Sequence, residues 1–297
     1  MNIYNLGSLN LDRVYSVPSF VRPGETIMSE NCTVFCGGKG LNQSVALARA
    51  GAHVYHIGII GHDGSQLRTM LLEAGVDTTY LNEVEGDSGH AIIQVVPSGQ
   101  NCIIVSAGTN RIITENYIQN ALMSMQRGDI FLTQNETSGV AFAIKAAHEK
   151  GVKVVLNPSP ITEELYKYPL DLVDIFILNE VEGTQLTGCN GTYTELLSSL
   201  VDRFPNAAIV LTVGKDGAYY AKGDTILYQQ AISVKPVDTT AAGDTFCGYF
   251  LASLSKGFSE RKALIHATRA AAIVVGRRGA APSIPSWTEM LSWDETR

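Results

Sequence analysis

The sequence lacks the features that would associate it with nucleic acid, a membrane or an export pathway. Lysine and arginine number 22 against 29 aspartate and glutamate residues, so the formal charge is −7 and there is no basic excess of the kind that nucleic-acid binding requires. No apolar run approaches the roughly 20 residues of a membrane span, and the first residues lack the basic and apolar segments of a signal peptide. We therefore expect a cytoplasmic protein that binds neither nucleic acid nor a membrane.

The five cysteines lack the pattern of a metal site or of a disulfide framework. Their number is odd, and they form neither a CxxC pair nor a Cys/His cluster at zinc-ligand spacing. We predict that they are reduced thiols in the core, as is usual in the cytosol. They are Cys32, Cys36, Cys102, Cys189 and Cys247.

Two common nucleotide-binding motifs are also missing. Residues 6–12 follow the first predicted strand, but they contain a single glycine, so the GxGxxG fingerprint of dinucleotide-binding proteins is absent. A P-loop is absent as well, because Lys39 is followed by Gly40 and not by serine or threonine. An NAD-dependent dehydrogenase, which a βα pattern alone would allow, is therefore disfavoured, and we expect NAD(H) neither to bind nor to react.

What the sequence does contain is ample material for one large core. Hydrophobic residues make up 45% and charged residues 17% of the 297 residues, which is typical of a globular protein. Short apolar segments alternate with segments of helical periodicity, and this order predicts parallel strands joined by helices. The predicted strands are Ile3–Leu6, His53–Ile59, Ile130–Thr133, Val152–Leu156, Ile175–Leu178 and Ile209–Val213, and the predicted helices are Gly40–Ala50, Ser65–Ala74, Val140–Lys150 and Thr245–Lys256.

We therefore expect an α/β fold with a mostly parallel sheet, helices on both of its faces, and ligands at the carboxyl ends of its strands. Two extended segments, residues 13–35 and 89–106, interrupt the alternation, and residues 97–101 are typical of a hairpin loop. They predict a small separate β-sheet that stands over the ligand edge as a lid. The expected organisation is a single domain of residues 1–297 with the lid formed by insertions 13–36 and 89–106.

A run of small residues before a predicted helix is the first candidate site. Ala241, Ala242 and Gly243 precede Asp244, where the apolar helix begins. The free N–H groups and the dipole of a helix start favour an anion, and small side chains let an anion touch the amides. The alternative is that Asp244 is only an N-cap and that the alanines avoid crowding.

Two further segments carry groups that suit a polyhydroxylated ligand. Residues 36–43 form a glycine-rich turn that leads into a helix and brings Lys39 and Asn42 near exposed backbone amides. Asn10 and Asp12, after the first strand, could clamp vicinal hydroxyl groups. A glycine turn with a capping amide, and a pair of turn-forming residues, are the respective alternatives.

The chain resembles the ribokinase (PfkB carbohydrate kinase) family along nearly its whole length. Seven motifs in the order of that family carry the resemblance: residues 7–12, 23–26, 37–43, 157–160, 179–182, 237–246 and 279–283. The resemblance implies a Rossmann-like three-layer α/β/α sandwich with a mostly parallel sheet and a small β-sheet lid. It also implies that the lid forms the interface of a homodimer.

The resemblance assigns roles to the candidate residues one by one. Asp244 matches the catalytic base, and Ala241, Ala242 and Gly243 with the Asp244 amide match the anion hole for the transferred phosphoryl group. These roles agree with the physics, since phosphoryl transfer depends on positioning and charge stabilisation. The positions that match sugar-binding residues are Asn10, Asp12, Gly38, Lys39, Asn42, Glu136 and Asp244.

The resemblance also implies sites for ATP, Mg²⁺ and a monovalent cation. Asn179 and Glu182 match a motif that organises Mg²⁺ and its waters, which is reasonable because Mg²⁺ takes few protein ligands. On its own, Glu182 has the pattern of a surface charge. The ATP-binding candidates are Asn179, Thr212, Gly214, Lys215 and Gly243, and the positions that match a K⁺ site are Asp238 and Ser283 with carbonyl groups of Thr240, Val274, Arg277 and Gly279.

The implied activity is transfer of the γ-phosphate of ATP to the 5-hydroxyl of D-ribose, giving ribose 5-phosphate. Asn10 favours ribose over deoxyribose, because an unpaired buried amide costs about 1–3 kcal/mol. Some positions depart from the family: Ala241 replaces the commoner glycine, Cys36 precedes the double glycine, Leu41 replaces a usual alanine, and Arg277 with Arg278 adds charge to the cation segment. The alternatives are a kinase of deoxyribose, another sugar or a nucleoside, and a sugar sensor without catalysis, against which the presence of Asp244 argues.

Overall fold

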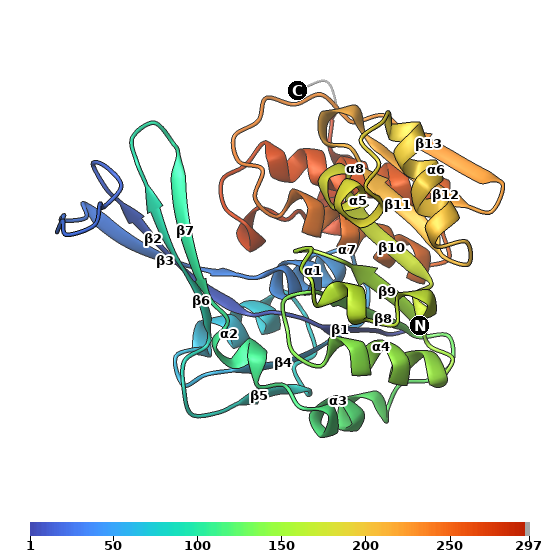
Figure 1. The fold of residues 1–297 in the computed structure, drawn as a ribbon, viewed down its shortest axis with the longest axis horizontal. Coiled ribbons are helices and arrows are strands. Elements are labelled where there is room, and N and C mark those ends of the chain that lie inside the picture. The colour runs from blue at the N-terminus through green and yellow to red at the C-terminus, as the bar shows by residue number, and fades with distance from the viewer. Residues whose placement is uncertain (295–297) are drawn as a thin grey trace.

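The computed structural model describes residues 1–294, and its largest element is a nine-stranded sheet in the order β13-β12-β11-β10-β9-β8-β1-β4-β5 (Figure 1). Every neighbouring pair from β5 to β11 is parallel, and β11-β12 and β12-β13 are antiparallel. The sheet is therefore mostly parallel, as predicted. The strands are β1 (Ile3–Leu6), β4 (Val54–Ile60), β5 (Leu81–Glu83), β8 (Ile130–Gln134), β9 (Lys153–Asn157), β10 (Ile175–Asn179), β11 (Ala208–Thr212), β12 (Ala218–Lys222) and β13 (Thr225–Gln229).

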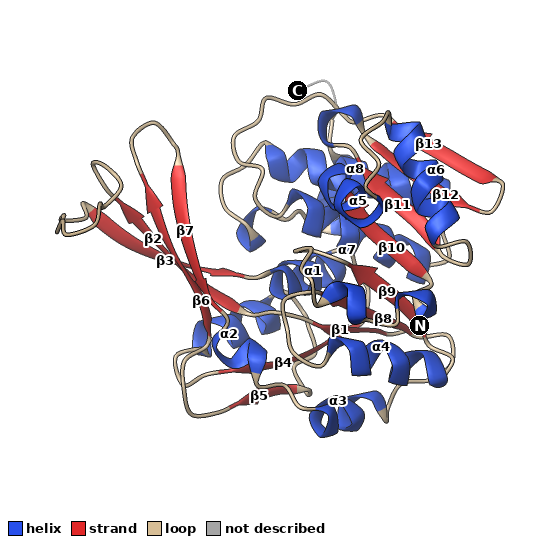
Figure 2. Ribbon diagram, viewed as in Figure 1, coloured by secondary structure: helices blue, strands red, loops and turns tan. Residues whose placement is uncertain are grey.

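Helices cover both faces of this sheet, which makes the three layers seen in Figure 2. Two separate apolar clusters fill the space between the layers, one on each face of the sheet. One cluster includes side chains of α1 (Lys39–Arg49), α2 (Ser65–Glu73), α7 (Ala242–Ser255), α8 (Glu260–Val275) and α9 (Trp287–Ser292). The other includes side chains of α3 (Glu115–Leu122), α4 (Val140–Glu149), α5 (Glu180–Thr187) and α6 (Tyr193–Arg203).

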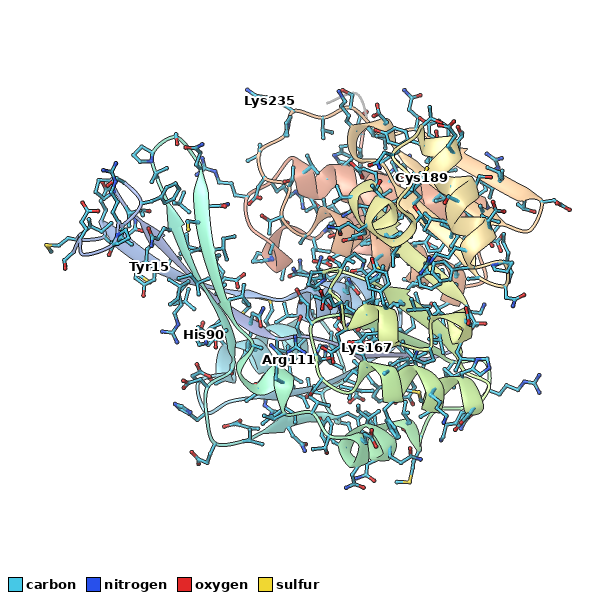
Figure 3. The ribbon with its side chains drawn as sticks, in the orientation of Figure 1. Tyr15, His90, Arg111, Lys167, Cys189 and Lys235 are labelled. Atoms are coloured by element: carbon cyan, nitrogen blue, oxygen red, sulfur yellow. The ribbon has the colours of Figure 1, made fainter. Side chains whose placement is uncertain are left out.

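A second sheet of four strands, in the order β3-β2-β6-β7, stands away from the main sheet (Figure 1). Its strands are β2 (Asn10–Ser16), β3 (Asn31–Gly37), β6 (Gly89–Val95) and β7 (Asn101–Ser106). Figure 3 labels Tyr15 on β2 and His90 on β6, and both lie on this sheet. We call these four strands the lid. The α/β fold with a small additional sheet is thus confirmed.

The structure changes some of the predicted boundaries. The first lid strand begins at Asn10 and not at residue 13, and residues 17–30 form no strand although they were expected to be extended. Pro18, Pro23 and Gly24 lie in this stretch, and Gly24 has a φ of 80°, which is a turn conformation and not a strand conformation. In the hairpin β12-β13, the edge strand β13 has no buried residue, so its sequence has little hydrophobic alternation to detect.

The cysteines differ from the prediction of core thiols. All five are free, but only Cys247 is buried, and Cys32 and Cys102 are exposed. These two lie on the edge strands β3 and β7 of the lid and belong to neither of the two apolar clusters. Residues 1–294 contain no helix that is long and apolar enough to cross a bilayer.

Candidate active site

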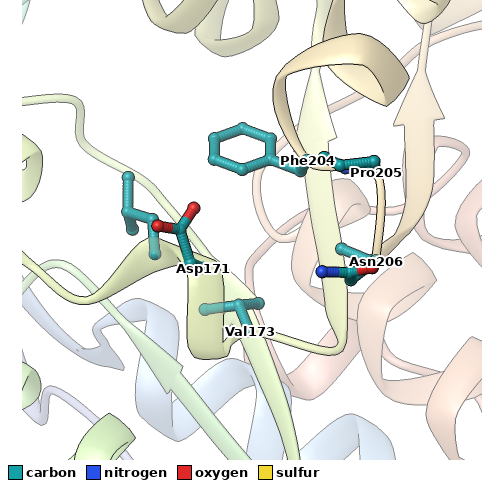
Figure 4. A pocket seen from close by; sticks show the side chains of 7 residues that line it. Asp171, Val173, Phe204, Pro205 and Asn206 are labelled. Carbon is teal, nitrogen blue, oxygen red and sulfur yellow. The ribbon is translucent and has the colours of Figure 1, made fainter.

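The candidate residues gather at the carboxyl ends of the parallel strands. Glu136 follows β8, Asn179 ends β10, and Thr212 ends β11, while Asp244 lies at the beginning of α7. The small cavity in Figure 4, of about 90 Å³, lies elsewhere. Asp171, Val173, Phe204, Pro205 and Asn206 line it, and these residues precede β10 and β11, so it opens at the amino ends of the strands.

Asp244 is held by two side-chain amides from the first turns of α1. Asn42 Nδ2 donates to Asp244 Oδ2 at 3.0 Å, and Gln43 Nε2 donates to Asp244 Oδ1 at 2.9 Å. Helix α7 begins at Ala242, earlier than predicted, so Asp244 is its third residue and not its N-cap. The interpretation of Asp244 as a helix cap is therefore wrong. Asp244 is 7% exposed, and its carboxylate is oriented by groups far away in the sequence.

The residues before Asp244 leave the start of α7 open to an anion. The N-cap residue is Ala241, which has no side-chain oxygen to bond the first N–H groups. Ala241 has a φ of 61°, the left-handed conformation, and it is the only residue other than glycine with positive φ in the described part of the chain. A Cβ added to Gly243 would meet nothing within 4 Å. The Ala242 N–H already donates to Thr239 O at 3.2 Å, so the open space coincides with the N–H groups of Gly243 and Asp244, which suits a phosphoryl group.

Lys39 lies among three of the candidate carboxylates. Its backbone N–H donates to Glu136 Oε2 at 3.2 Å, and Ser8 Oγ donates to the same oxygen. Burial lowers the pKa of the Lys39 ammonium, but the charges of Asp244, Glu136 and Glu182 outweigh burial and raise it. Lys39 therefore remains a cation between the predicted base and the predicted sugar and magnesium residues.

Glu136 and Asp12 are carboxylates that the structure brings near each other. Burial raises the pKa of Glu136, and the hydrogen bond from Ser8 acts in the opposite direction. Burial, followed by the charge of Glu136, raises the pKa of Asp12 to about 6. Two partly buried carboxylates with few donors have acceptor capacity for hydroxyl groups of a ligand.

Asn10 and Asp12 lie on strand β2 of the lid and not in a turn. Residues two apart on a strand share a face, so both side chains project from one side of the lid. A Cβ on Gly37 would lie 2.1 Å from Asp12 Oδ2, which explains why the opposite strand has a glycine there. Asn110 Nδ2 donates to Asn10 Oδ1 at 2.9 Å and fixes the amide of Asn10.

The predicted magnesium pair is built as the cap of α5. Asn179 Oδ1 accepts from the Glu182 N–H at 2.8 Å, and Glu182 Oε2 accepts from the Asn179 N–H at 2.9 Å. Glu182 is 8% exposed, so it is not the surface charge that its sequence context alone suggested. It has no ion-pair partner within 4.0 Å among residues 1–294, and a nearly buried carboxylate of this kind fits a nearby Mg²⁺.

The predicted ATP residues lie beside this cap. Thr212 is the register partner of Asn179 across β10 and β11, and its hydroxyl donates to Leu178 O at 3.4 Å. Gly214 and Lys215 form the 3₁₀ turn η4 (Gly214–Asp216), which follows β11. Both residues are exposed, so the turn is accessible to a ligand.

The predicted K⁺ residues come from two segments that Asp238 joins. Asp238 Oδ1 accepts from the Thr240 N–H at 2.9 Å and from its hydroxyl at 2.6 Å, and Asp238 Oδ2 accepts from the Gly279 N–H at 3.0 Å. Ser283 Oγ donates to Ala280 O at 2.7 Å, which places it in the turn η5 (Ala281–Ser283). An anionic side chain among backbone carbonyls is a donor set that fits K⁺. The carbonyl of Val274 already accepts from the Arg277 N–H at 2.9 Å.

Helix α1 connects these two regions. Asn42 and Gln43 near its start contact Asp244, whereas Arg49 at its end donates to Ala281 O at 2.9 Å and Ile284 O at 2.5 Å. The guanidinium therefore holds the backbone on both sides of Ser283.

Three residues at the site were not among the predicted ones. Gln43 bonds Asp244, Asn110 bonds Asn10, and Ser8 bonds Glu136. Ser8 and Gln43 stand inside the motifs noted above, and that position is a signal that could have identified them. Asn110 lies in the turn η1 (Gly108–Arg111) outside every motif, and no sequence signal marks it.

Known proteins resemble this chain over nearly its whole length. A family model described as pfkB family carbohydrate kinase matches residues 2–287. A ribokinase of Haemophilus influenzae is 38% identical over 301 residues, covering 98% of this chain and 97% of the relative. A deoxyribokinase of Salmonella typhimurium is 32% identical over 307 residues, covering 99% of this chain and 100% of the relative.

Solved structures agree with the sequence relatives. A ribokinase from Cryptococcus neoformans in complex with ADP has a TM-score of 0.87 and 33% identity, with 98% of each chain covered. An Arabidopsis thaliana ribokinase complexed with ribose and ATP has a TM-score of 0.87 and 29% identity, with 99% of each chain covered.

Proposed function

This chain belongs to the pfkB family of carbohydrate kinases, and we propose that it transfers the γ-phosphoryl group of ATP to the 5-hydroxyl of D-ribose, giving ribose 5-phosphate and ADP. The single observation that carries the chemistry is the pair of amide hydrogen bonds that fixes Asp244 beside the open start of α7. A base next to an anion site is what phosphoryl transfer to an alcohol requires.

In the proposed mechanism, Asp244 accepts the proton of the sugar hydroxyl while that oxygen forms a bond to the γ-phosphorus. The bond between the γ-phosphorus and the oxygen that bridges to the β-phosphorus breaks, and its electrons leave with ADP. The amides of Gly243 and Asp244 at the start of α7 stabilise the charge on the transferred group. Because Asp244 is held on both oxygens, little reorganisation accompanies proton transfer.

The sugar pocket in this proposal combines acceptors and donors from α1, β2 and the segment after β8. Asn42 Oδ1 is buried and has no hydrogen-bond donor among the described residues, so it can accept from a sugar hydroxyl. Asp12 and Glu136 supply carboxylate acceptors, and Lys39 and the amide of Asn10 supply donors. Gly38 has a φ of 93° and lies against Ser8, where a side chain would collide.

We further propose that Asn179 and Glu182 orient the waters of a Mg²⁺ ion at the phosphates, with Thr212, Gly214 and Lys215 contacting the nucleotide. A bound Mg²⁺ would neutralise charge on the phosphates. A K⁺ site beside the anion hole would use Asp238 and Ser283 with carbonyls of Thr240, Val274, Arg277 and Gly279.

We also propose a homodimer that pairs through the lid, within a one-domain organisation of residues 1–297. Phe35, Ile103 and Val105 lie on the face of the lid that carries Asp12, and they are 44%, 50% and 64% exposed. On the opposite face, residues of the 17–30 loop line a pocket with Tyr15, Ile92 and Gln94 and cover part of the sheet. A second copy would cover the apolar face that this chain leaves bare. Five free cysteines support a cytoplasmic location.

Deoxyribose is the second candidate acceptor, because a deoxyribokinase is among the relatives. The test is ADP release from ATP and Mg²⁺ with ribose, deoxyribose, fructose or a nucleoside, with and without K⁺. We expect the highest kcat/KM with ribose. Asp244→Asn should lower kcat about 10²–10⁴-fold while ribose still binds. Ribose binding without turnover by the unaltered protein would favour a sugar sensor. Faster turnover with deoxyribose than with ribose would make deoxyribose the preferred substrate.

A further inference from the structure

Gln43 makes a contact with Asp244 that the proposed mechanism does not use directly. Its Nε2 donates to Asp244 Oδ1 at 2.9 Å and also to Asn157 Oδ1 at 3.0 Å. Its Oε1 accepts from Gln134 Nε2 at 2.7 Å. All polar atoms of this completely buried side chain are therefore bonded to the protein, which leaves no group with which Gln43 could bind a sugar.

The direction of these hydrogen bonds is fixed from one end by the backbone. Asn5 Nδ2 donates to the carbonyl of Gly40 at 2.9 Å, and a carbonyl can only accept. Asn5 must consequently present its Oδ1 to Gln134, whose Nε2 donates to it at 2.9 Å. The same Nε2 group donates to Gln43 Oε1, so the amide of Gln43 can point only its NH₂ group at Asp244.

The other end is fixed in the same way. Asn157 Nδ2 donates to the carbonyl of Ile177 at 2.8 Å, so its Oδ1 faces Gln43 Nε2. Two backbone carbonyls, on different elements, thus impose one orientation on the four side chains Asn5, Gln134, Gln43 and Asn157. We call these four side chains the amide network.

One unsatisfied atom indicates that this orientation matters more than complete hydrogen bonding. Gln134 Oε1 is buried and has no donor among the described residues, an arrangement that costs about 1–3 kcal/mol in general. A flipped amide would place this oxygen against Asn5 Oδ1 and Gln43 Oε1, which both need a donor. The Oε1 atom instead lies next to Gly7. A Cβ on residue 7 would be only 2.6 Å from this oxygen, so a glycine at this position avoids the collision.

We propose that Gln43 is a positioning residue for Asp244, and that the amide network locks Gln43 so that it always donates to the carboxylate. The proposal rests on the role of Asp244 as the base in the proposed function. The fixed amide of Gln43 holds Asp244 Oδ1, and Asn42 holds Oδ2. The carboxylate is therefore oriented before the sugar binds. Because misplacement of a reacting group by about 1 Å can cost about 10²-fold in rate, the orientation of the Asp244 carboxylate affects kcat and not sugar affinity.

Ser44 offers a matched control, because it is buried beside the amide network without being needed to orient it. Its hydroxyl accepts from Asn5 Nδ2 at 2.8 Å and bonds His56 Nδ1 at 2.8 Å. Burial lowers the pKa of His56 to about 4, so this ring is neutral and brings no charge. Loss of the Ser44 hydroxyl leaves the Gly40 carbonyl to fix Asn5, so the orientation of Gln43 is unaffected.

The test compares kcat, the ribose KM and the melting temperature of Gln43→Met, Gln134→Met, the double variant, Ser44→Ala and Asp244→Asn. We expect kcat to fall about 10–10²-fold in Gln43→Met and less in Gln134→Met, with the ribose KM within about twofold in both. Because Gln134 acts through Gln43, the double variant should have the kcat of Gln43→Met alone. Ser44→Ala should keep the unaltered kcat even where its melting temperature falls as far as that of Gln134→Met.

Each other outcome contradicts either the positioning role of Gln43 or the proposed function. If Gln43→Met keeps its kcat while Asp244→Asn loses activity, the positioning role is wrong and the base assignment stands. A kcat that falls in proportion to melting temperature in all variants, Ser44→Ala included, would make the amide network purely structural. If Asp244→Asn retains turnover, the proposed function itself fails.

Discussion

Asn110 Nδ2 donates to Asn10 Oδ1, and Asn110 Oδ1 accepts from the Leu9 N–H at 3.0 Å, so the turn η1 sets the amide of Asn10 at the base of the lid. This hydrogen bond orients the Asn10 amide and leaves its NH₂ group available to donate to a sugar. We predict that Asn110→Ala raises the ribose KM about tenfold, in line with the loss of about 1–1.5 kcal/mol for a hydrogen bond, and leaves the ATP KM unchanged. Steady-state kinetics with each substrate varied checks this. A change confined to ATP would contradict it.

Ala241 has a strained backbone that glycine would relax. A left-handed φ of 61° destabilises the folded state by about 1–2 kcal/mol when the residue is alanine. Glycine removes this strain, but it makes the unfolded chain more flexible, which lowers the free energy of unfolding by about 0.4–1 kcal/mol. We predict that Ala241→Gly raises the free energy of unfolding by about 0.5–1 kcal/mol, measured by urea denaturation. Ala242→Gly is the control, because Ala242 has no positive φ and its replacement should destabilise α7. Equal effects of the two changes would show that the φ of Ala241 carries no strain.

Asp12 should give the proposed sugar site a pH dependence. Its pKa of about 6 lies above the ordinary value of 3.8, so the folded protein holds more protons on Asp12 than the unfolded chain does between these values. Its contribution to stability is present below pH 3.8 and is lost as the pH rises through about 6. Ribose binding has the opposite trend, because the ionised carboxylate is the better acceptor for a hydroxyl.

We predict that ribose affinity falls about tenfold from pH 7 to pH 5, measured by calorimetry, in proportion to the ionised fraction of Asp12. Glu136, the other carboxylate nearby, also has a raised pKa and adds in the same direction. Asp12→Asn should bind ribose more weakly at pH 7 and with a flatter pH profile. An unaltered profile in Asp12→Asn would assign the titration to Glu136.

Asp238 should determine the response to K⁺. Burial alone would raise the pKa of Asp238, but hydrogen bonds from Thr240 and Gly279 lower it, so it remains an anion. We predict that K⁺ stimulates turnover over an equal concentration of choline chloride and that Asp238→Asn abolishes this stimulation. Asp224→Asn, an exposed carboxylate between β12 and β13, is the matched control. Equal stimulation of both variants would remove Asp238 from the cation site.

The two faces of the lid should respond differently to a charge. Ile103 lies on the Asp12 face and Ile104 on the opposite face, and they are 50% and 62% exposed. We predict that Ile103→Asp converts a dimer to a monomer in sedimentation velocity, because a buried unpaired charge destabilises an interface. Ile104→Asp should remain dimeric. Loss of the dimer only in Ile104→Asp would place the interface on the other face.

The sequence predicts the centre of this fold better than its edges. Buried central strands such as β10 are short apolar runs between turns, so their pattern is unambiguous. At the edge, β13 is largely exposed, and the lid strand β2 begins without a turn signal that would separate it from residues 6–9. Local pattern is weakest where a strand is exposed or where no turn residue marks its start.

In the candidate site, the sequence predicts local motifs but not contacts between distant residues. The glycine-rich turn and the run before Asp244 are visible because their chemistry is contained within a few neighbouring residues. The contact of Gln43 with Asp244 joins positions 201 residues apart, and the contact of Asn110 with Asn10 joins positions 100 apart. No spacing rule reaches that far in a single sequence, so these partners emerge only from the folded chain.

The length of helix α1 is constrained by contacts at both of its ends. Asn42 and Arg49 must face Asp244 and the 281–284 backbone at the same time, and about 10 Å of helix separates them. Inserting or deleting one residue between them would turn one end by about 100° relative to the other and move it by about 1.5 Å. Substitutions between Gln43 and Arg49 keep this spacing, whereas a change in the number of residues there would break one of the two contacts.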